Sequence, residues 1–130
     1  MNSCRCHRGE TTVQVVLMVP VIFLLLLVGV HVASYMHASN VANSAAKRSA
    51  QVAAGMPDQY QASLVASSSV SDMVNSLGAR LSRPVDVSIS PRFVTVSVHL
   101  RIASILPFLP DTVTKRGIAR RELFVSEAER

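Results

Sequence analysis

Hydrophobic and polar positions follow different patterns in successive parts of this chain. Positions 13–33 are apolar apart from Gln14 and His31. A run of about 20 apolar residues is the length that an α-helix needs to cross the hydrocarbon core of a bilayer. The run has no polar stripe at helical spacing, which argues against the core helix of a soluble domain. The pattern therefore predicts a membrane-spanning helix.

A cleavable secretory signal is the alternative interpretation of this run. Such signals have an apolar region of about 7–15 residues, followed by a cleavage site of small residues. The run here is longer, and positions 31–38 contain no clean site of that kind. Arg5 and Arg8 precede the run, whereas no Lys or Arg follows it before Lys47. We therefore expect a retained single span, with the N-terminus cytoplasmic and the rest of the chain translocated.

The helical pattern continues beyond the span, because positions 35–54 contain neither proline nor glycine. Gly55 and Pro57 then predict the end of the helix. A single helix over residues 11–54 would be on the order of 65 Å long. Its second half carries a face of small residues at three- and four-residue steps, namely Ala38, Ala42, Ala45, Ser49 and Ala53. This face could pack against another helix or against the chain's own C-terminal part, and the sequence leaves both alternatives open.

Two residues inside the span are candidates for helix packing in the membrane. Pro20 and Gly29 are both tolerated in a transmembrane helix. Pro20 also frees a backbone carbonyl, which a neighbouring group must satisfy or a kink must relieve. We expect these positions to take part in contacts between helices.

The C-terminal part of the chain changes from a helical to an alternating pattern. Residues 58–77 keep apolar positions at helical spacing and predict a second helix. Residues 85–89 and 94–102 alternate apolar and polar positions, which predicts an antiparallel hairpin. An irregular, arginine-rich segment over 112–124 is the candidate for a third strand. The expected fold is α+β, with a long N-terminal transmembrane helix that leads into a small extracytoplasmic domain.

These patterns divide the chain into successive parts. Residues 1–9 form a cytoplasmic leader, and residues 10–54 form the transmembrane and extended helix. Residues 55–130 form the small α+β extracytoplasmic domain, built from a helix and either an antiparallel hairpin or a three-stranded sheet. About 75 residues make a small core, which lateral partners would help to stabilise.

Composition and charge exclude several classes of function. The chain holds 13 Lys and Arg against 8 Asp and Glu, for a net charge of +5. These basic residues are scattered, apart from Lys115, Arg116, Arg120 and Arg121. Aromatic residues make up 5% of the chain, and it has no Trp, which leaves few platforms for stacking bases. We therefore expect a solvated basic surface and no nucleic-acid partner.

No residue pattern indicates catalysis or a bound cofactor. Cys4 and Cys6 both precede the apolar run, and with His7 they fall short of a closed tetrahedral metal site. Free thiols fit a cytoplasmic N-terminus. Nucleophile elbows, phosphate-binding glycine loops and zinc-protease helices are missing from the sequence. His31 and His37 fall at the outer edge of the span, where we expect interfacial water. The expectation is a protein that is not an enzyme and has no metal, cofactor or small-molecule substrate.

The order of these features resembles a known family. Arg8-Gly9, an apolar run that contains Pro20, and an alanine-rich extension with Ala45-Ala46 are similar to the TadE-like pseudopilins. These are minor-pilin-like proteins of the tight-adherence (Flp-type) pilus systems of bacteria. The segment over 106–122 is also similar to the way such chains close.

This resemblance implies a processing site and a set of partners. A prepilin peptidase would cut after Gly9 and leave Glu10 as the new N-terminus. The family pattern has a glutamate at the fifth mature position, where this chain has Gln14. Gln14 can offer only a neutral hydrogen bond to a neighbouring subunit's α-amino group, which is weaker than an ion pair. The other implied partners are membrane lipid, other pilins or pseudopilins, and the inner-membrane pilus assembly platform.

The resemblance also implies a role and a location. The chain would be a minor or priming structural subunit, packed through its N-terminal helix. It would reside in the bacterial cytoplasmic membrane, from which it could pass to the pilus or the cell surface. One rival is a single-pass anchored binding domain with no pilus role, whose basic tail touches cell-wall polymer or a protein. The other rival is a secreted domain that has lost the apolar run.

Overall fold

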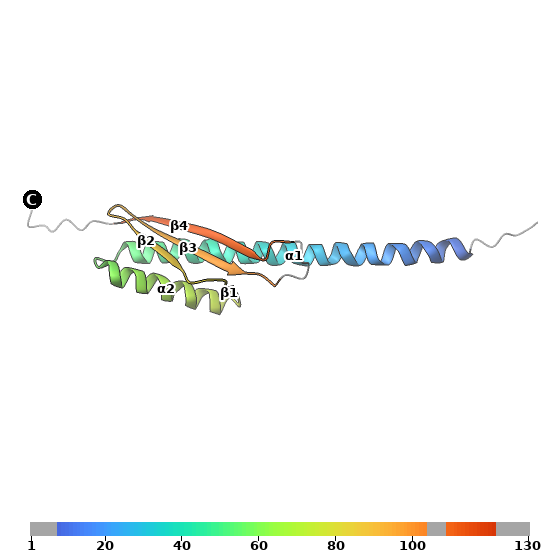
Figure 1. Cartoon of the computed structure of the whole chain (residues 1–130), viewed down its shortest axis with the longest axis horizontal. Coiled ribbons are helices and arrows are strands. Elements are labelled where there is room, and N and C mark those ends of the chain that lie inside the picture. Colours follow the sequence, from blue (N-terminus) through green and yellow to red (C-terminus); the bar gives the residue numbers. More distant parts are fainter. Residues whose placement is uncertain (1–7, 104–108, 122–130) are drawn as a thin grey trace, which may run out of the picture. The chain divides into compact units, whose positions relative to one another are not determined.

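A computed structural model describes residues 8–103 and 109–121 of the chain, with side chains from residue 12 onward. Helices α1 (Arg8–Ala54) and α2 (Gln59–Ser76) precede strands β1 (Arg80–Leu81), β2 (Asp86–Ile89), β3 (Phe93–Arg101) and β4 (Thr112–Arg120), as Figure 1 shows. A long apolar helix followed by a second helix and a small antiparallel sheet confirms the expected α+β fold.

The chain divides into two compact units, Met1–Ala33 and Ser34–Arg130. The second unit, called the C-terminal domain below, therefore includes the second half of α1. The sequence pattern predicts that the folded domain begins at residue 55. The difference arises because the small face of α1 is part of the domain's core rather than a linker to it.

Both helices end where the local sequence predicts. The last helical residue of α1 is Ala54, directly before Gly55. Asp58 caps α2, because its carboxylate accepts a hydrogen bond of 3.3 Å from the amide of Tyr60. At the other end of α2, Gly78 adopts a φ of 70°, a left-handed conformation that favours glycine. The expected helix over 58–77 is thus confirmed.

The sheet is antiparallel and centred on β3. One edge of β3 pairs with β4 along its whole length, from Phe93 opposite Arg120 to Arg101 opposite Thr112. The other edge of β3 pairs with β2 and then with the short strand β1. The sheet therefore has β3 in the middle, β4 along one side, and β2 and β1 in succession along the other.

One face of this sheet forms the core of the C-terminal domain together with both helices. The alternating residues of β3 are fully buried there, and α2 contributes residues at helical spacing. In Figure 1 the sheet lies across α2 and the second half of α1. The core residues of these elements are Val94, Val96, Val98 and Leu100 from β3, Val113 from β4, and Ala62, Ala66, Val70 and Val74 from α2.

The sheet comes very close to α1 at Gly117 of β4. A Cβ atom built at this glycine would lie 2.6 Å from the backbone nitrogen of Lys47 and closer still to the carbonyl group of Ala46. These are backbone atoms of a helix, which cannot move aside as a flexible side chain can. Only glycine fits this position of β4 without displacing the strand from α1.

We predict that Gly117→Ala destabilises the C-terminal domain by about 2 kcal/mol, the usual cost of overpacking a filled core. Urea unfolding of the full chain in detergent, followed by circular dichroism, measures this change. Gly29→Ala is the matched control, because nothing lies within 4 Å of a Cβ atom built at Gly29. Equal unfolding midpoints for Gly117→Ala and the parent chain would contradict the packing described above.

Candidate functional site

The first part of α1 presents large apolar side chains around its whole circumference. The large apolar side chains from Val13 to Leu26 are more than half exposed, for example Leu17 at 66% and Phe23 at 62%. A water-soluble domain would not leave such a continuous apolar surface unburied. By length and composition, α1 is able to cross a membrane. This apolar segment, residues 12–30, is the candidate functional site.

The predicted packing positions within the apolar segment are accessible. Pro20 is exposed, and α1 continues through it without a break in the helix. Its ring leaves the carbonyl of Val16 without the usual helical donor. Gly29 is also exposed, and no atom of the described residues lies within 4 Å of a Cβ atom built there. A neighbouring helix could therefore approach both positions.

The predicted processing residues lie at the start of the same helix. Gly9 and Glu10 belong to the first turns of α1, and the side chain of Glu10 lies outside the described part of the chain. Gln14 is exposed on α1, one turn further along. Since the backbone of Gly9 is helical, a peptidase would have to unwind this end of α1 to reach the bond after it.

The small-residue face of α1 is buried within the C-terminal domain. Ala42, Ala45 and Ser49 have no exposed surface, and Ala38 and Ala53 are nearly as well buried. The Ser49 hydroxyl donates a hydrogen bond of 2.7 Å to the carbonyl oxygen of Ala45, so this polar group is satisfied inside the core. Of the two alternatives that the sequence left open, the structure shows packing against the chain's own domain. The sequence pattern did not identify Gly117, the strand residue that lies against the backbone of α1 at Ala46 and Lys47.

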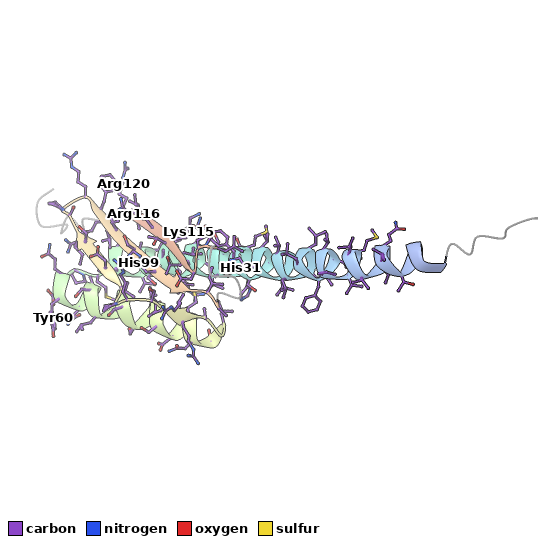
Figure 2. All side chains as sticks on the ribbon, turned by 45° about the vertical axis from the view of Figure 1, so that its right-hand side comes forward. His31, Tyr60, His99, Lys115, Arg116 and Arg120 are labelled. Carbon is purple, nitrogen blue, oxygen red and sulfur yellow. The ribbon has the colours of Figure 1, made fainter. Side chains whose placement is uncertain are left out.

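The histidines differ in their surroundings. His31, labelled in Figure 2, is 3% exposed, and neither of its ring nitrogens has a hydrogen-bond partner among the described residues. The expectation of interfacial water is therefore wrong for His31, whereas His37 is exposed. In the sheet, the Nδ1 atom of His99 lies 2.8 Å from the hydroxyl of Thr114 on the neighbouring strand.

The basic cluster predicted near the C-terminus lies on and after β4. Arg116 and Arg120 are exposed, and Lys115 is half-buried on the core side of the same strand. Figure 2 labels these three residues along β4. Arg121 follows the strand and donates a hydrogen bond of 2.7 Å to the carbonyl oxygen of Pro57. Cys4, Cys6 and His7 lie outside the described residues.

These features define a class of protein: a small α+β domain whose first helix also carries an apolar segment long enough to span a membrane. Comparison with protein families then gives a more specific result. Residues 9–51 match the family described as TadE-like protein, which confirms the resemblance noted from the sequence. No curated protein and no solved structure matches the chain. The family suggests a role in the assembly of Tad pili, and the long apolar helix is consistent with a single-pass membrane anchor.

We predict that Leu24→Arg, in the middle of the apolar segment, prevents stable membrane insertion. An arginine at the centre of a spanning helix costs about 3 kcal/mol on insertion scales. Extraction of membranes with alkaline carbonate should release this variant while the parent chain stays in the pellet. Gln51→Arg is the control, because it adds the same charge at an exposed position of α1 within the C-terminal domain. Retention of Leu24→Arg in the pellet would contradict a spanning role for this segment.

Proposed function

We propose that this protein is a minor pilin or pseudopilin that acts in the assembly of a bacterial tight-adherence (Flp-type) pilus. It is a structural subunit rather than an enzyme. Its N-terminal helix holds it in the cytoplasmic membrane, with the leader in the cytoplasm and the C-terminal domain outside. From the membrane, the helix exchanges lipid contacts for contacts with other pilins at the inner-membrane assembly platform.

The observation that carries this proposal is the continuous exposed apolar surface of α1 within the segment that matches the TadE-like family. A helix that only anchored a domain would need no more than sufficient length and hydrophobicity. A subunit of an assembly also needs places where another helix can approach. Gly29 offers open space for such an approach. The carbonyl of Val16, which Pro20 leaves without its helical donor, offers a hydrogen-bond acceptor.

The distribution of burial along α1 indicates which part of the helix makes contacts between subunits. The small-residue face is buried in the core of the C-terminal domain and is not available to a second helix while the domain is folded. The large apolar side chains from Val13 to Leu26 are instead exposed. We therefore assign the contacts between subunits to the apolar segment, including Pro20 and Gly29.

The mature N-terminus of the protein tests the proposal. The full chain is co-expressed with a prepilin peptidase, extracted from membranes with detergent and measured by intact-mass spectrometry. A chain that begins at Glu10 supports a processed pseudopilin. A chain that retains Met1 indicates a plain anchored domain, and a chain that begins beyond Ala33 indicates a secreted domain. Either of the last two results would overturn the proposal.

We also predict that Gln14→Glu increases the proportion of the protein found in assembled pilus fractions. A carboxylate at this position can form an ion pair with the α-amino group of a neighbouring processed subunit, which a neutral amide cannot do. Immunoblotting of sheared surface fractions measures the change. Thr12→Glu is the matched control, because it adds the same charge two residues earlier. An equal increase with both variants would show a general charge effect instead of a specific pair.

A further inference from the structure

Strand β4 is an edge strand whose outer side has no partner in the described structure. It pairs only with β3, and no backbone hydrogen bond joins its other edge to the rest of residues 8–103 and 109–121. Such an edge is a template for a further strand.

The register of the ladder identifies the backbone groups that point outward. The amide of Ile102 donates to the carbonyl oxygen of Asp111, and the amide of Arg121 donates to that of Arg92. Because hydrogen-bonded and non-bonded pairs alternate in an antiparallel ladder, Val113, Lys115, Gly117 and Ala119 point their backbone groups toward β3. The residues between them, Thr114, Arg116 and Ile118, therefore present free amide and carbonyl groups at the open edge.

A hollow of about 410 Å³ lies beside this edge. It is lined by the end of α1, at Gln51, Ala54 and Gly55, and by Ile118, Ala119 and Arg120 of β4. The lining combines small residues with longer polar side chains, so the hollow offers both apolar and polar contacts to a side chain from an added strand. Ile118, which borders the hollow, is 63% exposed and offers a second apolar contact.

The charge of β4 determines what kind of strand can pair with it. Its basic residues are Lys115, Arg116 and Arg120, and it contains no acidic residue. On the exposed face of the sheet, Asp86 is separated from Arg116 by Ser97 of β3, so it lies about 10 Å away across two strand spacings. Pairing of two β4 edges would place arginines from both copies on one face, which is unfavourable. An acidic strand with an apolar side chain is the complementary partner.

The chain itself contains a segment of this kind. Residues 122–130, which lie outside the described structure, have the sequence ELFVSEAER. They combine an apolar stretch with three glutamates and one arginine. We propose that the segment 122–130 of a second copy of this chain adds to the open edge of β4 as an antiparallel strand.

An antiparallel register follows from charge and shape together. Pairing Glu127 with Arg116 places Val125 opposite Ile118 on the exposed face. Phe124 then lies opposite Ala119 on the other face, beside the hollow. If the segment folded back onto β4 of its own chain in this register, the consecutive residues Arg121 and Glu122 would have to face each other. A single chain cannot make such a turn. The segment also lacks the glycine, asparagine, aspartate and proline that tight hairpins use, so pairing occurs between copies.

Hydrogen exchange on the full chain tests the proposal. The chain is held as one copy per lipid nanodisc and titrated with a synthetic peptide of residues 122–130. At a peptide concentration about 100 times the Kd, exchange of the outward amides of Thr114, Arg116 and Ile118 should slow about 100-fold. The amides of Lys115 and Gly117 already pair with β3 and should change little. A peptide of the same composition in scrambled order is the control. Equal protection by the scrambled peptide would show general polyanion binding and overturn the proposal.

Substitutions separate backbone pairing from charge. Ile118→Pro removes one outward amide without breaking a bond to β3, so it should weaken peptide binding. Ile118→Thr keeps the amide and should bind the peptide more tightly than Ile118→Pro does.

The charge of Arg116 is tested in the same way. Arg116→Glu should weaken peptide binding about fivefold, and a peptide with Glu127→Arg should restore it. Arg83→Glu, outside β4, is the charge control. Unchanged binding to both Ile118→Pro and Arg116→Glu would overturn the proposal.

A crosslink identifies whether the contact forms between copies. Ile118→Cys and Val125→Cys are placed in separately tagged full chains in which Cys4 and Cys6 are serine. Directly opposed residues of a hydrogen-bonded antiparallel pair lie about 5.5 Å apart at Cα, within reach of a disulfide. A disulfide between the two tags supports the proposal, and its absence under oxidation overturns it. None of these experiments depends on leader processing, so they can fail while the proposed pilus role holds.

Discussion

The close contact between Gly117 of β4 and the backbone of α1 at Ala46 is the constraint on which the C-terminal domain depends. Neither side of this contact has room for a side chain larger than that of the residue present. The alanines of α1 let the sheet lie directly on the helix, and the glycine lets the strand come closer still. The valines of β3 and α2 then fill the space around this contact.

The apolar segment of α1 and the half of α1 within the C-terminal domain have different roles. The second part supplies a buried face to the C-terminal domain, so its small residues stabilise the domain itself. The first part has the opposite character, since its large apolar side chains remain exposed. A single helix thus combines a structural element of a folded domain with a surface suited to lipid and to other helices. The match to the TadE-like family extends over both parts.

Much of the fold could be predicted because its signals are local. The apolar run, the stop at Gly55 and the alternation of β3 depend on neighbouring residues, so they can be read along the chain. The segment of β4 was harder to interpret, because Lys115 and Gly117 occupy core-facing positions that normally hold apolar side chains. The glycine is explained only by the helix that it contacts. The burial of His31 likewise has no signal in the surrounding residues.

The sequence by itself determined the α+β class, the ends of both helices, and the presence of a segment long and apolar enough to cross a membrane. These properties follow from composition and periodicity over short stretches. Only the tertiary structure decided that the alanine face of α1 is buried in the core of its own domain, and that β4 has an open edge among the described residues. Both depend on which distant segments meet, and a small-residue face is equally compatible with a strand or with another helix.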